Sequence, residues 1–186
     1  GYDAQSYRKE TIEQLSDRYR HHLEQLVTLC DTTFGYTPSD FPLAGLPQAA
    51  LDRLALQHGD TIDDIYPLTP MQAGMLFHTL SDPGNTAYFE QFHGRLKGRI
   101  DPGHFKASWQ RIVRRHPILR TGFHHHTDTP LQLVFKSAEI PIEVLDWQHM
   151  APPEKEKQLE RLLTSERNRG FDLETAPLMR IHLILE

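Results

Sequence analysis

Apolar residues recur every three or four positions in the first part of the chain, with charged residues between them. This spacing predicts an amphipathic helix within residues 1–30, because positions three and four apart share one face of a helix. The later sequence offers no obvious partner for that face, so we interpret the helix as the end of a domain that lies upstream. The apolar stripe consists of Ile12, Leu15, Tyr19, Leu23, Leu26, Val27 and Cys30.

Residues 31–61 have the composition of a linker that contains one short helix. Prolines and glycines gather between Gly35 and Gly45. After them come a proline suited to a first helical turn, two leucines on one face and a glycine suited to a helix end. This pattern predicts a helix between Pro47 and Gly59.

From Ile62 to Glu186 the pattern changes to that of a compact domain. Thr69 and Gln72 flank a proline and can form a capping box, which predicts a helix that begins there. The order of elements is that of a mixed α/β fold, an α+β two-layer sandwich, which stops on a strand without a closing element. The further predicted elements are strands over 88–96, 121–125, 131–135, 140–145 and 178–185, a helix from Asp101 to Pro117, and a helix over 153–169.

Composition and charge narrow the class of protein. The 186 residues suffice for one ordinary domain, or for a smaller domain with flanking helices. The net charge of -5 argues against nucleic-acid binding, which favours a basic excess. No apolar run approaches the roughly 20 residues of a membrane span, so we expect no membrane partner. The single cysteine, Cys30, cannot form an internal disulfide, and we expect a cytoplasmic location.

The sequence contains twelve histidines, and the run His124-His125-His126 suggests a metal site. On a continuous strand, successive side chains point to opposite faces, so His124 and His126 could share a face whereas His125 could not. Neither a Cys-x-x-Cys nor a His-Glu-x-x-His arrangement supports them. We therefore expect no metal ligands in this chain, and an exposed polar strand at this run.

Four stretches resemble nonribosomal peptide synthetases, in the order in which that family has them. Residues 65–78 (IYPLTPMQAGMLFH) and 114–123 (RRHPILRTGF) resemble the first and second motifs of condensation domains. Residues 170–180, which include GFDL and PLMR, resemble the segment that leads into the central strand of such a domain. Residues 36–43 (YTPSDFPL) resemble the segment that follows epimerization domains, and the helix before them resembles the end of one.

The resemblance implies the N-terminal lobe of a condensation domain, whose fold is similar to that of chloramphenicol acetyltransferase, with two lobes and a tunnel between them. It assigns residues 1–30 to the C-terminal helix of an upstream, epimerization-like domain, 31–61 to a linker or docking segment, and 62–186 to the first part of the condensation domain. The family's catalytic signature, His-His-x-x-x-Asp-Gly, is expected after these residues and is absent from them. The run that starts at His124 is not this signature, because no glycine follows Asp128 at the required spacing.

The implied activity is peptide-bond formation between a donor and an acceptor aminoacyl thioester, each carried on the phosphopantetheine of a partner carrier protein. The chain itself has no carrier-protein serine motif, nucleophile elbow or phosphate-binding glycine loop, so we expect neither catalytic nor cofactor-binding residues in it. The other expected partners are the upstream epimerization domain and the remaining half of the condensation domain. Two alternatives stay open: an interdomain docking module without catalysis, and a complete small acyltransferase with His125 or His126 as its base.

Two groups of candidate site residues follow from the resemblance. Arg120 matches an arginine that braces the active site by pairing with the aspartate of the missing signature, a role suited to its bidentate guanidinium. Without that partner, we expect its side chain to face water or local carbonyls. The linker could dock in a groove through Phe41 and Leu43 if it is extended, or it could be a passive connection. The docking candidates are Thr37, Pro38, Ser39, Asp40, Phe41 and Leu43.

Overall fold

The computed structural model describes residues 2–3, 5–32, 34–82, 86–126 and 129–186. The chain divides into two compact units. The first consists of Gly1–Thr37 and Pro47–Asp60, and the second of Pro38–Leu46 and Thr61–Glu186. The segment predicted as a linker is thus shared between the two units.

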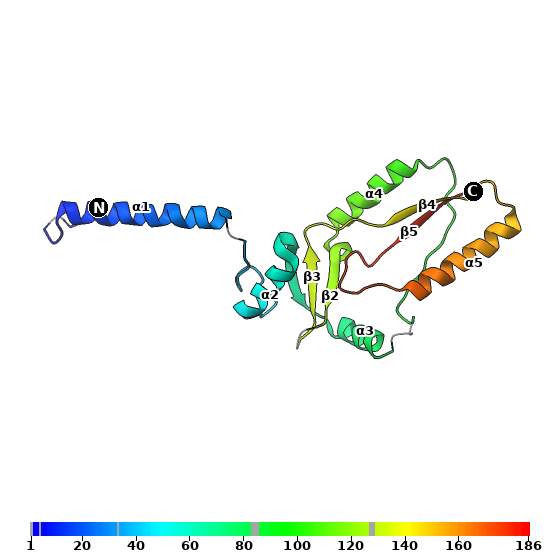
Figure 1. Ribbon diagram of the computed structural model, residues 1–186, viewed down its shortest axis with the longest axis horizontal. Helices are drawn as coiled ribbons and strands as arrows, with labels where there is room; N and C mark the ends of the chain where they lie inside the picture. Colours follow the sequence, from blue (N-terminus) through cyan, green and yellow to red (C-terminus); the bar gives the residue numbers. More distant parts are fainter. Residues whose placement is uncertain (1, 4, 33, 83–85, 127–128) are drawn as a thin grey trace. The chain divides into compact units, whose positions relative to one another are not determined.

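The first unit holds the two helices predicted for it, α1 (Lys9–Thr32) and α2 (Gln48–His58). α1 is one continuous helix (Figure 1). Leu51 and Leu54 are buried on α2, as the pattern predicts. Gly59 ends α2 with a φ of 57°, a conformation that glycine adopts at little cost. A short 3-10 turn, η1 (Gly59–Thr61), follows.

The second unit contains a three-stranded antiparallel sheet in the order β1 (Ile62–Pro67), β3 (Leu131–Phe135), β2 (Thr121–His124). β3 is therefore paired along both edges. The sequence pattern predicts β2 and β3 but not β1. A shift in register between Ile62 and Asp64 breaks the alternation of β1, so that Ile62 and Ile65 are both buried although they are three positions apart.

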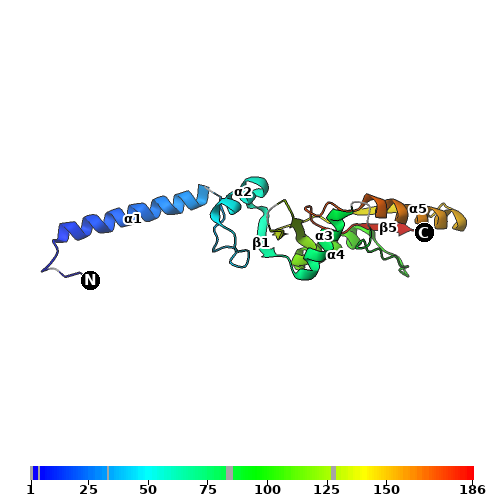
Figure 2. The same ribbon diagram turned by 90° about the horizontal axis from the view of Figure 1, so that it is seen from below.

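A second sheet pairs β4 (Ile142–Asp146) with β5 (Ile181–Leu185) in parallel. Parallel neighbours need a crossover connection, which α5 (Pro152–Arg169) provides. α5 runs beside the β4–β5 pair in both ribbon views (Figures 1 and 2). Gly170, with a φ of 60°, ends α5 as predicted. The mixture of helices with two sheets confirms the predicted α/β class.

α3 (Pro70–Ser81) and α4 (Pro102–Arg115) begin with the caps that the sequence predicts. The Thr69 hydroxyl accepts a hydrogen bond from the Gln72 amide at 3.3 Å, and Oε1 of Gln72 accepts one from the Thr69 amide at 2.9 Å, which completes a capping box. Asp101 caps α4, and the short turn η2 (Pro117–Arg120) leads from α4 into β2. None of the helices in the described ranges combines the length and apolar character needed to cross a membrane.

The predicted strand over 88–96 is wrong, because these residues pair with no strand in the described part of the chain. A side chain anchors them instead: Gln91 donates a hydrogen bond to the Leu163 carbonyl of α5 at 2.8 Å and accepts one from Arg167 at 2.9 Å. Phe92 is 97% exposed, so the alternation that suggested a strand does not face a core. Strand propensity takes effect only where a neighbouring strand and a packed face are available.

Two glycines provide a matched test of the packing. A Cβ added at Gly122 of β2 would lie 2.6 Å from the backbone oxygen of Glu174, whereas one added at Gly74 of α3 would meet nothing within 4 Å. We expect Gly122→Ala to lower the free energy of unfolding by about 1–3 kcal/mol, because backbone cannot move aside as a side chain can. Gly74→Ala should raise it by about 0.5–1 kcal/mol, because alanine favours a helix.

Urea unfolding of both variants measures these changes. A neutral Gly122→Ala or a destabilising Gly74→Ala would contradict the packing described for β2 and α3.

Candidate functional site

Three of the four stretches that resemble known motifs meet at one hollow in the second unit. The hollow has a volume of about 740 Å³. Its walls come from α3 in the first stretch, from Phe123 in the second, and from Phe171, Leu173 and Leu178 in the third. Residues 88–90 contribute a further side. Because segments distant in the sequence converge on this hollow, we take it as the candidate functional site.

Aromatic side chains give the hollow an apolar wall. Phe89 and Phe171 stack with their ring centroids 5.4 Å apart and their planes inclined by 26°. The guanidinium of Arg180 lies over the ring of Phe171, 4.1 Å from its centroid. These contacts hold the residues around Phe89, which have no strand partner among the described residues, against the segment that follows α5.

Arg180 also belongs to a nearly buried ionic cluster with Glu166 and His182. Its Nε donates to Oε2 of Glu166 at 2.6 Å, and its Nη1 donates to the Gly170 carbonyl at 2.6 Å. Nε2 of His182 lies 3.6 Å from the same carboxylate oxygen. The Glu166 and Arg180 side chains are only 14% and 11% exposed, so these hydrogen bonds offset the cost of burying two charges. The cluster ties the start of β5 to the end of α5.

The surroundings of Glu166 keep it ionised. Burial by itself raises the pKa of Glu166, because it disfavours the charged form. The hydrogen bond and charge of Arg180, together with His182, outweigh burial and hold the pKa below its ordinary value of 4.5. Glu166 is therefore an anchor rather than a proton donor near neutral pH. Sequence reasoning missed it because nothing in α5 marks a contact with a residue 14 positions further on.

Arg120, the candidate brace, ends η2 and is only 6% exposed. Its Nη1 donates to the carbonyl of Phe135, the last residue of β3, and lies 3.4 Å from Oδ2 of Asp63 in β1. The expectation that this side chain faces water is wrong, because the ends of two neighbouring strands supply acceptors. Its Nε has no hydrogen-bond partner within the described ranges.

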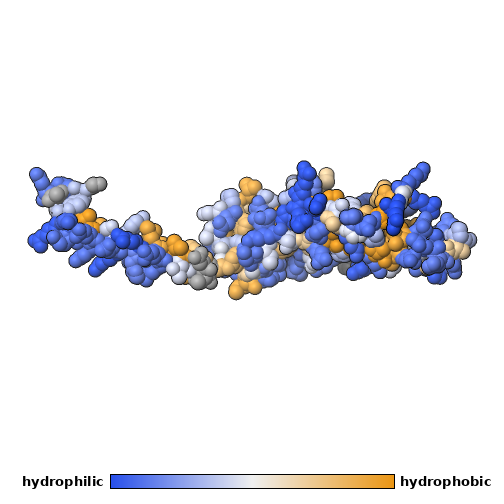
Figure 3. Space-filling model, turned by 90° about the horizontal axis from the view of Figure 1, so that it is seen from above, coloured by the Kyte–Doolittle hydropathy of each residue, from blue (hydrophilic) through white to orange (hydrophobic). Residues whose placement is uncertain are grey.

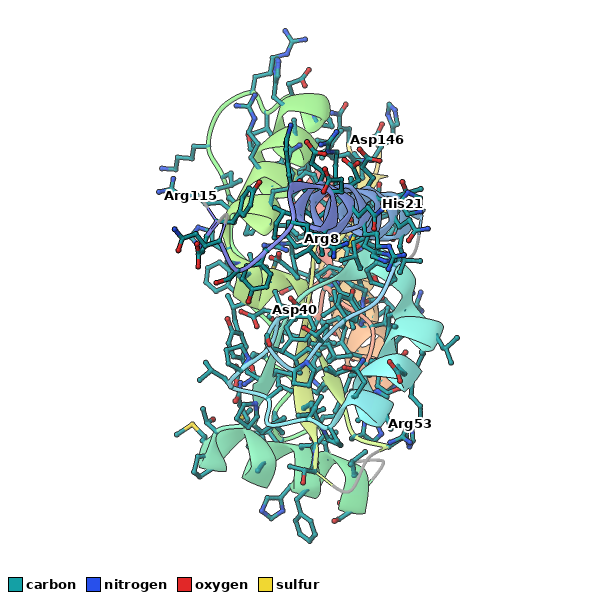
Figure 4. The ribbon with its side chains drawn as sticks, turned by 90° about the vertical axis from the view of Figure 1, so that its left-hand side faces the viewer. Arg8, His21, Asp40, Arg53, Arg115 and Asp146 are labelled. Carbon is teal, nitrogen blue, oxygen red and sulfur yellow. The ribbon has the colours of Figure 1, made fainter. Side chains whose placement is uncertain are left out.

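The docking candidates fall into both units: Thr37 belongs to the first, and Pro38 to Leu43 belong to the second. Asp40 lies on the loop that precedes α2 (Figure 4). The expected extended conformation is wrong, because residues 38–40 and 42–44 form turns. The second turn separates the two apolar side chains, so that Phe41 is 5% exposed and Leu43 is 68% exposed. The docking role of these residues stays a prediction.

The histidine run differs from its prediction as well. β2 ends at His124, so the alternation assumed for the run does not extend to His125 and His126. His124 is 7% exposed rather than part of an exposed strand. All three imidazoles lie close to the carboxylate of Glu174, which sequence reasoning did not single out. Asp128, the aspartate of this run, lies outside the described residues.

Comparison with known proteins gives matches along almost the whole chain. A family model described as "Condensation domain" matches residues 62–185. The chain is 41% identical to one of the linear gramicidin synthase proteins of Brevibacillus parabrevis over 181 residues, which are 96% of this chain and 4% of that protein. It is 33% identical to bacitracin synthase 3 of Bacillus licheniformis over 186 residues, 98% of this chain and 3% of that protein. The chain thus spans only a few per cent of the length of these relatives.

Solved structures share the fold of this chain. The starter condensation domain of rhizomide synthetase RzmA matches with a TM-score of 0.53 at 20% identity, over 64% of this chain and 28% of that chain. The condensation domain of the monacolin K polyketide synthase MokA matches with a TM-score of 0.52 at 17% identity, over 67% of this chain and 28% of that chain. These matches confirm the fold class expected from the sequence.

The ionic cluster allows a prediction with a matched control. Arg180→Ala should lower the free energy of unfolding by about 3–5 kcal/mol, because it removes the closest charge partner and hydrogen-bond donor of the nearly buried Glu166 carboxylate. Arg169 contacts the same carboxylate at 3.7 Å, but its side chain is 66% exposed. Arg169→Ala should therefore cost less than about 1 kcal/mol. Equal losses of stability in the two variants, measured by denaturant unfolding, would contradict the role given to Arg180.

The lowered pKa of Glu166 also predicts how stability depends on pH. Because the unfolded chain takes up this proton at a higher pH than the folded chain, the stabilisation is present above the ordinary value of 4.5 and is lost as the pH falls below it. The stability difference between the unaltered protein and Glu166→Gln should therefore shrink between about pH 6 and about pH 3. Thermal unfolding at several pH values measures it, and a difference that grows toward acid would refute the lowered pKa.

Proposed function

Because this chain belongs to the condensation-domain family, we propose that it forms the first part of a condensation domain in a nonribosomal peptide synthetase. The activity of that domain is peptide-bond formation between carrier-bound donor and acceptor aminoacyl thioesters. The observation that carries the proposal is the match of the family over residues 62–185, together with the convergence of three of its motifs on one hollow. The chain has no catalytic histidine signature of its own, so catalysis requires the rest of the domain.

The hollow suits one wall of a tunnel in which two tethered substrates meet. In the reaction, the amine of the acceptor attacks the thioester carbonyl of the donor, and the phosphopantetheine thiolate of the donor carrier leaves. Orientation of two bound reactants can supply about 7–11 kcal/mol of such a barrier. The stacked rings of Phe89 and Phe171 provide a firm apolar surface, and the buried Arg180 fixes that surface to α5.

Arg120 is the residue of this chain that the proposal places closest to the chemistry. By resemblance, it pairs with the aspartate of the signature that follows in the complete domain. Two features support this role: the guanidinium is buried and held by Phe135 and Asp63, and its Nε keeps a donor without a partner in the described structure. A guanidinium with an unpartnered donor has a hydrogen bond left to offer to a carboxylate.

The proposed partners follow from the assignment of the chain to a nonribosomal peptide synthetase. Hydrophobic side chains recur along α1 among hydrophilic ones (Figure 3), and Leu15, Tyr19 and Leu26 are 63%, 66% and 55% exposed. An apolar stripe of this kind fits a neighbouring domain, which we infer to be an epimerization-like domain upstream. Carrier proteins would bring the substrates on phosphopantetheine, and the assembly would work in the cytoplasm.

The test uses a synthetase that contains this chain. Arg120→Ala should slow peptide-bond formation between two loaded carrier proteins by about 100-fold or more, because a displaced brace misplaces the reacting groups. Arg115, an exposed arginine of the same motif, is the control, and Arg115→Ala should leave the rate within about twofold. Arg120→Lys keeps the charge but loses the bidentate geometry, and it guards against loss of folding in the alanine variant.

Single-turnover transfer, followed by the mass of the carrier-bound products, measures these rates. Equal rates for Arg120→Ala and Arg115→Ala in folded protein would rule out the brace. Peptide formation by the 186-residue chain alone would favour the small acyltransferase. If the chain bound a separate neighbouring domain while its motif variants left peptide formation unchanged, a docking module would be favoured instead.

A further inference from the structure

Three histidines surround one carboxylate at the end of β2. Nδ1 of His124 and Nδ1 of His125 lie 3.3 and 3.4 Å from Oε1 of Glu174, and Nε2 of His126 lies 3.9 Å from the same oxygen. We name these residues the His–Glu174 cluster. Possible ligand atoms of His125, His126 and Glu174 all lie within 4.8 Å of one another.

The backbone around the cluster is held in place from both sides. The Phe123 amide donates to the Leu173 carbonyl at 2.7 Å, and the His125 amide donates to Oε1 of Glu174 at 3.2 Å. The absence of a side chain at Gly122 lets the two segments approach, since a Cβ there would lie 2.6 Å from the Glu174 carbonyl oxygen. The backbone and the Glu174 carboxylate are therefore held in place by contacts that do not involve the imidazoles, and such support favours a binding site.

The separation of His125 from Glu174 fits a pair of metal ligands better than a close hydrogen bond. A charge-assisted N–H···O bond is about 2.7–2.9 Å long. Around a tetrahedral ion with bonds of about 2.0–2.1 Å, neighbouring ligand atoms are about 3.3–3.4 Å apart. The separation of 3.4 Å between His125 and Glu174 agrees with the second value. His126 lies further from Glu174, at 3.9 Å, and its side chain is 72% exposed, so its ring has room to turn toward the carboxylate.

We propose that the His–Glu174 cluster binds a divalent transition metal ion of the zinc class, with His125, His126 and Glu174 as ligands and His124 positioning the carboxylate. Two imidazoles and a carboxylate suit such ions, whereas calcium and magnesium prefer oxygen ligands alone. Nδ1 of His125 also lies 3.3 Å from the Phe123 carbonyl. The ion replaces this contact or uses the other nitrogen of the ring.

The bound ion would connect two segments that also line the hollow. His125 and His126 follow β2, and Glu174 lies between Leu173, which lines the hollow, and the start of β5. The role that we propose for the ion is to link these two segments. It stands independently of the proposed peptide-bond formation.

The test is a titration of Zn²⁺ into tag-free protein after removal of metals with a chelator, followed by calorimetry. The visible absorption of Co²⁺ in the same protein reports the number and type of ligands. We expect one ion per chain, and His126→Ala and Glu174→Gln should each weaken binding by about 10-fold or more. The exposure of His126 and the acceptor oxygen that glutamine retains for the His125 amide keep both variants folded.

The control is a second pair of adjacent histidines, His21 and His22 of α1, whose ring centroids are 5.8 Å apart. The double variant His21→Ala/His22→Ala should bind Zn²⁺ as the unaltered protein does. The inference is overturned if no ion binds, if the control variant loses binding as well, or if His126→Ala and Glu174→Gln bind with unchanged affinity. The last result would identify the cluster as ion pairs between histidines and a carboxylate.

Discussion

The pairing of β3 along both edges is the constraint on which the second unit depends. A strand in the middle of a sheet leaves no backbone group free for other partners, so its side chains and its two ends must make every further connection. The buried apolar side chains of β3 are Leu131, Leu133 and Val134. Gln132 extends the network, since its Nε2 donates to the Pro67 carbonyl and to Gln72, which also completes the cap of α3. β3 thereby fixes the position at which α3 begins.

The end of β3 determines the position of Arg120 in the same way. The Phe135 carbonyl lies beyond the last ladder contact with β2, and the guanidinium takes it as an acceptor while it pairs with Asp63 of β1. An arginine buried to this extent would be unfavourable without such acceptors. Its position is therefore a consequence of where two strands end.

Local signals made the helices predictable. Caps, terminal glycines and periodic apolar residues lie within a few positions of the element they define, so Thr69 with Gln72 and the glycines at 59 and 170 identified helix ends correctly. Apart from the turns at residues 38–40 and 42–44, the errors involve partners distant in the sequence. The strand expected over 88–96 has no neighbouring strand in the described structure. The bulge in β1 breaks the alternation of apolar residues by which a strand is predicted from sequence. Glu174 faces His125 from 49 positions away, and no local pattern could reveal that contact.

The segment from Gly170 to Arg180 shows how these distant contacts combine. At one end, Phe171 stacks on Phe89. In the middle, Leu173 and Glu174 accept hydrogen bonds from backbone amides that follow Gly122. At the other end, Arg180 is buried against α5. A segment held at three points has little freedom, so it fixes the direction in which β5 starts. In the family that this chain belongs to, the resemblance places the catalytic histidines after that strand. The packing contacts of this segment therefore orient the strand that precedes the expected position of those histidines.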